Sequence, residues 1–261
     1  MTTDCTTSVL RDLLRVYDHR FLALERSQRD RLVEGTRRAI GEEGLSEAVR
    51  AGLPAAYRLR AFCIQHGLRE ELERLIGDEA AGSPAGAVVV GGRVYAMYPY
   101  LRGVSRQDVD ITAEIGVEHR ADAVAWQGQG EVRVRGAARL ERVETHRTAV
   151  DLVLRERESK AEHRVAAETG EDGFTAVADM TAAGPGRWDL FVAATALGIT
   201  REARFGTVRG PALKDEPLRR ALGDGLTATV YFTKGGHLAV HVRPAPAPPP
   251  LRTKIIRRLA R

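Results

Sequence analysis

The stretch EAAGSPAGAVVVGGRVYAMY, residues 79–98, separates two kinds of sequence in this 261-residue chain. Its first part collects Ala, Gly, Ser and Pro, which is the composition of a linker. Its second part places two apolar runs, 87–90 and 93–98, on either side of a Gly-Gly pair, and this pattern predicts a β-hairpin. We therefore expect short helices before residue 80 and strands after residue 85.

Upstream of this stretch, apolar residues recur at helical spacing. Val9, Leu13 and Val16 are three or four positions apart, and Pro54 and Gly67 are placed as the start and end signals of one helix. Helices are predicted over residues 6–24, 27–42, 45–51, 55–66 and 68–76. Residues 1–80 are thus expected to form a small helical, linker-type region.

Downstream, apolar and polar residues alternate with period two, which is typical of strands with one buried face. Strands are predicted at 109–115, 132–135, 150–155, 161–167, 174–180, 187–195, 199–205, 226–233 and 237–243. The stretch 210–224 breaks the pattern and is expected to be a long loop or a short helix. Many short strands without intervening helices favour an α+β chain with an antiparallel immunoglobulin-like β-sandwich over residues 85–243.

The positive charge gathers at the end of the chain. The formal net charge is +5, and no acid follows Asp224. The body is therefore expected to be nearly neutral, which argues against nucleic acid as a partner. Residues 244–261 are predicted to be a Pro-rich spacer and a basic amphipathic tail. The tail residues expected to bind an anionic membrane surface or an acidic polymer are Arg252, Lys254, Arg257, Arg258 and Arg261.

The two cysteines, Cys5 and Cys63, form neither a disulfide framework nor a zinc pattern, so a reducing compartment is expected. Residues 1–20 hold no secretory apolar core, and no apolar run approaches the roughly 20 residues that span a bilayer. The expected location is the cytoplasm, with peripheral contact at the inner face of the cell membrane. The preference for Arg over Lys suggests a GC-rich genome, for instance an actinobacterial one.

No complete catalytic constellation is found. Asp108 and Asp110 have the spacing that can hold a divalent cation, but a polar loop entering a strand explains them better, so no metal site is assigned. No phosphate loop or dinucleotide fingerprint is found, so no cofactor is expected. Trp126 and Trp188 can stack on sugars, yet their apolar neighbours favour the sandwich core for both.

Several phrases resemble the region that follows the catalytic domain in bacterial family 2 glycosyltransferases related to wall-teichoic-acid sugar transferases. They occur at residues 51–62, 94–102, 108–115, 123–138, 173–176 and 186–192. The resemblance implies a helical linker and an immunoglobulin-like domain, of a kind associated with oligomerisation and polymer binding. The acidic metal motif and the general base of that family's catalytic domain have no match here, so no catalytic residue is carried over.

The leading hypothesis is a non-catalytic accessory region of a cell-envelope glycosyltransferase. It would mediate oligomerisation, or bind an acceptor or a membrane surface, with a second copy or a glycosyltransferase catalytic domain as partner. Two alternatives stay open. One is an enzyme whose metal site uses Asp108, Asp110 and Glu114, and the other is a carbohydrate-binding module that uses Trp126 or Trp188.

Overall fold

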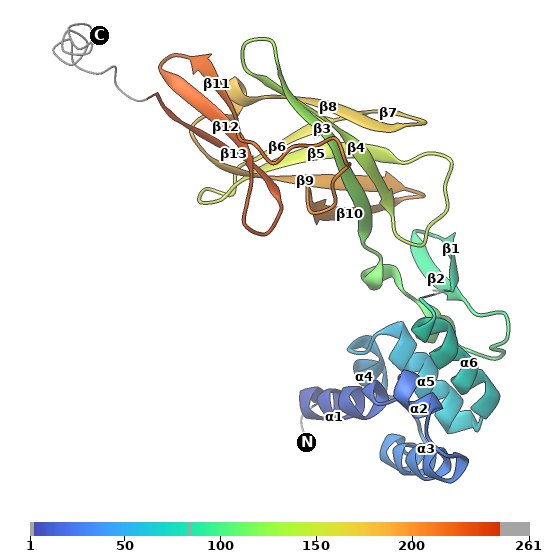
Figure 1. Ribbon diagram of the computed structural model, residues 1–261. Coiled ribbons are helices and arrows are strands. Elements are labelled where there is room, and N and C mark those ends of the chain that lie inside the picture. Colours follow the sequence, from blue (N-terminus) through green and yellow to red (C-terminus); the bar gives the residue numbers. More distant parts are fainter. Residues whose placement is uncertain (1–2, 83–84, 246–261) are drawn as a thin grey trace, which may run out of the picture. The chain divides into compact units, whose positions relative to one another are not determined.

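The computed structural model describes residues 3–82 and 85–245, and its fold class is α+β, as the sequence predicts (Figure 1). The chain divides into two compact units. The first, called the helical unit, contains Met1–Ile115, Glu141–Thr145 and Leu197–Ile199; the second, called the sandwich unit, contains Gly116–Leu140, His146–Ala196 and Thr200–Arg261. Within the described ranges, no helix is long and apolar enough to cross a membrane.

The helices between residues 3 and 80 follow the predicted segments, with one difference. The expected helix over 6–24 is two helices, because the side chain of Asp18 accepts a hydrogen bond from the amide of Arg20 and so starts a new one. Gly67 ends the fifth helix in the left-handed conformation, at φ +69°. The bounds are α1 Thr3–Arg15, α2 His19–Leu22, α3 Arg26–Ile40, α4 Glu47–Ala51, α5 Ala55–His66, α6 Arg69–Ala80 and α7 Arg106–Val109.

The core of the helical unit is built from the apolar faces of these short helices. Leu14, Tyr17 and Phe21 are at most 2% exposed and share a cluster with Ile64 and Leu72. The hydroxyl of Tyr17 donates to Thr36 Oγ1 at 2.7 Å, which satisfies a buried polar group. Both cysteines are free thiols; Cys5 is exposed, and burial raises the pKa of the Cys63 thiol to about 12.

The predicted hairpin forms, with β1 Gly86–Val90 paired antiparallel to β2 Arg93–Met97. It belongs to the helical unit, which extends to Ile115. The amide of Ile111 donates to Val94 O at 2.9 Å and so ties the segment after α7 to β2. The compact unit thus contains both the expected 1–80 region and the start of the expected 85–243 region.

The strand predicted at 109–115 is wrong. Residues 106–109 form α7, and a 3-10 helix follows at Thr112–Glu114. Asp110 Oδ1 accepts from the amide of Thr112 at 2.9 Å, a local turn that competes with the strand conformation. The apolar residues of the segment are still buried, with Ile111 at 1% and Ile115 at 4% exposure. The hydrophobic pattern therefore marked burial correctly and conformation incorrectly.

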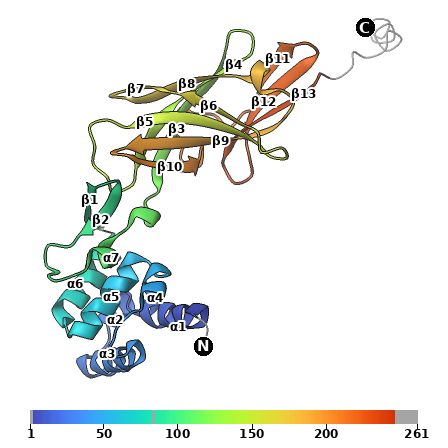
Figure 2. The same ribbon diagram turned by 180° about the vertical axis from the view of Figure 1, so that it is seen from behind.

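Two antiparallel sheets make up the sandwich unit (Figures 1 and 2). The smaller has the order β3-β4-β8-β7; the larger has the order β11-β12-β13-β9-β5-β6, with β10 also paired to β9. Their bounds are β3 Val117–Gln127, β4 Glu131–Leu140, β5 Ala149–Glu156, β6 Glu162–Ala166, β7 Glu168–Gly170, β8 Gly173–Asp179, β9 Gly186–Ala196, β10 Ile199–Arg204, β11 Leu218–Gly223, β12 Leu226–Phe232 and β13 Leu238–Pro244. One helical turn, α8 Met180–Ala183, joins β8 to β9.

Alternate residues of the two sheets fill the space between them. Val134 of β4, Leu152 of β5 and Val192 of β9 are fully buried, and β4 packs against β9. Gly136 permits the close approach of β3 and β4, because a Cβ there would lie 2.2 Å from Arg120 O. The prediction of an antiparallel sandwich is confirmed.

Candidate anion-binding surface

The predicted metal candidates lie in the helical unit and are held by arginines. Asp108 is 5% exposed, its Oδ1 lies 2.8 Å from Arg50 Nε, and its Oδ2 accepts from the hydroxyl of Ser105 at 2.7 Å. Asp110 Oδ2 accepts from Arg93 Nη1 at 2.9 Å. Each carboxylate thus has a structural role at the junction of α7 and the hairpin.

Glu114, the third residue of the metal alternative, is also engaged. Its Oε1 accepts from the amide of Ala55 at 2.7 Å, at the start of α5. Across residues 3–82 and 85–245, no group of three or more His, Cys, Asp or Glu side chains is arranged to hold a metal ion.

The two tryptophans differ in how deeply their rings are buried. Trp188 is 2% exposed and its Nε1 donates to Gly184 O at 3.2 Å, so it occupies the sandwich core as expected. Trp126 is only partly buried, and its Nε1 donates to Leu218 O at 3.1 Å, which links β3 to β11. The expectation that both indoles lie in the core is correct for Trp188, whereas Trp126 lies opposite the buried Val132 and is only partly covered. The tail cations Arg252, Lys254, Arg257, Arg258 and Arg261 lie outside the described residues.

The register of the larger sheet gathers cations that are distant in the sequence. Arg187 on β9 is opposite His241 on β13, His241 is opposite Thr229 on β12, and Thr229 is opposite Arg219 on β11. Arg243, two residues after His241, lies on the same face because side chains alternate along a strand. We call Arg187, Arg219, His241 and Arg243 the cation face.

Among the described residues, no acidic side chain is paired with the arginines of the cation face. Arg187, Arg219 and Arg243 are exposed, and within the described chain none of them forms an ion pair. The other half of the same sheet face is different. There Arg155 pairs with Glu162 at 2.8 Å and with Glu202 at 2.9 Å, and a similar pair holds Arg164. One half is therefore neutralised and the other carries unbalanced positive charge.

Glu156 fixes the backbone at Arg187 of the cation face and at Arg157, whose amide donates to Arg187 O at 2.9 Å. Its carboxylate accepts hydrogen bonds from the amides of Glu158 and Ser159, both at 2.6 Å, and from the amide of Arg187 at 3.1 Å. These donors, the amide of Ser159 foremost, lower the pKa of Glu156 to about 2. The start of β9 and the turn after β5 are thereby locked together.

The pKa of His241 is consistent with a positive electrostatic potential at the cation face. Partial burial, and then the neighbouring guanidinium groups of Arg187, Arg243 and Arg157, hold the pKa of His241 below its usual range. Its imidazole is therefore neutral at neutral pH, in a field that disfavours a further positive charge. Such a field favours an anion.

An open pocket of about 690 Å³ adjoins the face, and we call it the Arg157 pocket. Asp189 Oδ1 accepts from Arg157 Nη2 at 2.7 Å and from Arg204 Nη2 at 2.6 Å, so one carboxylate holds two guanidinium groups. The end of β12 and the turn between β12 and β13 supply the rest of the lining, including Lys234. The lining residues are Arg157, Asp189, Arg204, Tyr231, Thr233, Lys234, Gly235 and His237.

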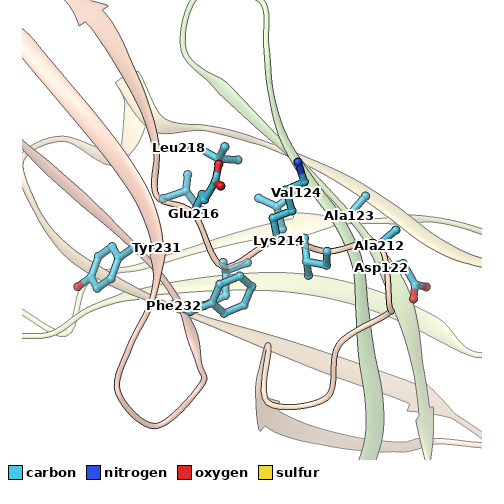
Figure 3. Close-up of a pocket in the computed structure, with 12 residues that line it drawn as sticks. Asp122, Ala123, Val124, Ala212, Lys214, Glu216, Leu218, Tyr231 and Phe232 are labelled. Carbon is cyan, nitrogen blue, oxygen red and sulfur yellow. The ribbon is translucent and has the colours of Figure 1, made fainter.

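A second pocket, of about 300 Å³, lies between β3 and the β11–β12 hairpin (Figure 3). Its walls are mainly apolar, with Val124, Leu218 and Phe232 among them. Lys214 and Glu216 reach it from the segment before β11 (Figure 3). Because its charged groups have both signs, this pocket has no clear preference for an anion or a cation.

Sequence reasoning missed the cation face because it treated the charge of the body as a sum. The arginines concerned come from β9, β11 and β13, and only the strand register brings them to one surface. β11 itself was expected to be a loop or a short helix. A signal was available in 240–243, where His241 and Arg243 alternate with Val240 and Val242.

No protein-family model matches the sequence, and no curated protein does. Among solved structures, the crystal structure of S. aureus TarS 217–571 is similar, with a TM-score of 0.54 and 13% sequence identity over 92% of this chain and 70% of that chain. This chain has the fold of TarS 217–571. The crystal structure of S. aureus TarS gives a TM-score of 0.44 and 14% identity, covering 83% of this chain; this chain spans 38% of that one. The resemblance found in the sequence is thus confirmed at the level of the fold, which TarS 217–571 shares.

Proposed function

We propose that this chain is a non-catalytic accessory region of a cell-envelope glycosyltransferase, whose sandwich unit binds an anionic cell-wall polymer through the cation face. TarS, whose residues 217–571 have the same fold, is a wall-teichoic-acid glycosyltransferase. The observation that carries the proposal is the set of exposed arginines Arg187, Arg219 and Arg243, which form no ion pair within residues 3–82 and 85–245, beside a neutralised half of the same sheet.

The physical argument is that of a polyelectrolyte binding to a fixed array of cations. A charged polymer releases condensed counterions when cations neutralise it, so its affinity depends steeply on salt. A rigid sheet holds these cations in place before binding, which reduces the ordering cost on association. The face would therefore bind a polymer with repeated negative charges better than a single anion.

The test is fluorescence anisotropy of labelled wall teichoic acid with the full chain. We expect Arg187→Gln/Arg243→Gln to bind about tenfold more weakly at low salt, because two fixed cations are removed. The matched control is Arg133→Gln/Arg135→Gln, which removes equal charge from exposed positions on β4 in the other sheet. Equal losses in both variants would contradict the proposal, and so would tighter binding of single-stranded RNA than of teichoic acid.

Membrane contact and self-association belong to the same proposal. Each cation near an anionic leaflet contributes about 1 kcal/mol to membrane binding. The five cations of the tail would therefore give weak binding, and one tail alone would contact the membrane only transiently. Flotation with anionic liposomes, with and without residues 251–261, tests the tail. Light scattering coupled to size exclusion tests for a homo-oligomer. If the chain is a monomer and does not bind anionic liposomes, both membrane contact and self-association are refuted, while the proposal of polymer binding is unaffected.

A further inference from the structure

We propose that the Arg157 pocket is a subsite for the phosphate group of a polyol or sugar phosphate. This inference rests on the proposed function, to which it adds the chemistry of the repeating unit. It concerns one defined pocket, whereas the cation face supplies charge over a wider surface.

The pocket has more hydrogen-bond donors than its own acceptor can use. A guanidinium group carries five N–H donors. Arg157 gives two of them to Asp189 and Arg204 gives one, although both side chains remain about one-third exposed, at 34% and 33%. Within the described chain, Arg204 Nε is buried without an acceptor. With Lys234, three cations face a single carboxylate in the lining.

The donors are held in place before any ligand arrives. Asp189 fixes the two guanidinium groups, and the amide of Leu238 donates to Phe205 O at 2.8 Å, which ties the residue after Arg204 to β13. Lys234 sits in a turn closed by two backbone hydrogen bonds of 2.8 Å, from Thr233 to His237 and from Gly236 to Thr233. A preorganised set of donors binds an anion with little ordering cost.

The arrangement suits phosphate better than carboxylate. Planar guanidinium groups bind phosphate oxygens in a bidentate manner, and a lysine ammonium adds a point charge. A phosphate ester offers oxygens in three dimensions, so donors from the turn after β5, the end of β10 and the β12–β13 turn can reach it together. A volume of about 690 Å³ exceeds the need of one phosphate group and leaves room for an attached polyol beside Tyr231 and Thr233.

The experiment uses the full chain and three small probes: glycerol 3-phosphate, glycerate and glycerol. Amide chemical shifts of Thr233, Gly235 and Gly236 are followed during each titration. We expect glycerol 3-phosphate to move them and to bind more tightly than glycerate, with no response to glycerol. Lys234→Gln, at an exposed turn position, should weaken glycerol 3-phosphate about tenfold, since a hydrogen bond to a charged group is lost.

The matched control is Lys214→Gln, which removes an ammonium group at the other pocket and should leave glycerol 3-phosphate binding unchanged. Arg204→Gln is a second pocket variant, in which Asp189 keeps Arg157 as its partner. Equal affinity for glycerate and glycerol 3-phosphate would overturn the inference. So would unchanged binding in both pocket variants, or no shift at the turn.

Each of the two proposals can be refuted without the other. If teichoic acid binds and depends on Arg187 and Arg243 but glycerol 3-phosphate does not perturb the turn, the phosphate subsite is wrong and the proposed function stands. If glycerol 3-phosphate binds in the pocket and teichoic acid does not bind, the subsite stands and the polymer-binding function is wrong.

Discussion

At the scale of single residues, Glu156 shows how one carboxylate can organise a binding surface. It is 7% exposed, and its oxygens accept from backbone amides on both sides of the β5–β9 junction. Gly186, at φ +149°, makes room for it, because a Cβ there would lie 2.9 Å from Glu156 Cγ. Arg157 and Arg187 project from the two segments that Glu156 joins.

Glu156→Gln is expected to lower Tm at neutral pH. The side-chain amide of Gln would place an N–H donor opposite backbone N–H groups that now donate to the carboxylate. The folded-state pKa of about 2 lies below the usual 4.5, so the carboxylate contributes stability that is complete above pH 4.5 and is lost as pH falls toward 2. The Tm difference between wild type and variant should shrink over that window in thermal melts. Glu158→Gln serves as a control, and a difference independent of pH would contradict this account.

The tryptophans give a second residue-scale prediction. Trp188→Ala should lower the free energy of unfolding by about 3–5 kcal/mol, since a fully buried indole leaves a cavity. Trp126→Ala should have a smaller effect, because that ring is partly exposed and loses mainly its bond to Leu218 O. Urea denaturation measures both, and equal losses would show that Trp126 is a core residue after all.

At the scale of elements, the alternation of apolar and polar residues predicted the central strands of the larger sheet well. β5, β9 and β13 lie where the sequence places them, because each buries one complete face in the sandwich. β11 was missed because it lies at the edge of its sheet, follows Pro217 and exposes Arg219 and Arg220. An edge strand buries too little apolar surface for its sequence to require alternating apolar and polar residues.

Segment 105–115 is held to the helices by Arg58. Arg58 Nη1 donates to Leu53 O at 2.7 Å and its Nε to Asp108 O at 3.3 Å, and Asp110 O is a further acceptor. Arg58→Met should cost about 3 kcal/mol, because it leaves these buried carbonyls unpaired. Hydrogen exchange should rise at Ile111 in the variant. Arg38→Met, at an exposed position of α3, is the control; an Arg58 variant as stable as this control would refute the role.

At the scale of the whole molecule, the fold class followed from the sequence and the binding surface did not. Net charge is a sum, and a sum hides the separation of a neutralised half-sheet from a cationic one. The residues involved lie between positions 151 and 243, and the hydrogen-bond register of the strands sets their neighbours. Charge patterning across strands becomes readable only when the order of the strands is known.

Polymer binding should depend on pH through His241. A bound polyanion offsets Arg187, Arg243 and Arg157, so it raises the lowered pKa of His241. Protonation then favours the complex, and affinity should increase as pH falls from the pKa in the complex toward the pKa in the free chain. NMR titration of the imidazole with and without teichoic acid measures the shift. His241→Gln should lose this pH dependence, and a wild-type affinity that is flat with pH would contradict the prediction.

The place of β11 at the sheet border has a consequence for colloidal behaviour. Its adjacent guanidinium groups repel the same border of another molecule, a common protection of unpaired strands against edge-to-edge association. A polyanion that neutralises Arg219 removes that repulsion. Turbidity should therefore pass through a maximum near charge equivalence and clear again when polymer is in excess.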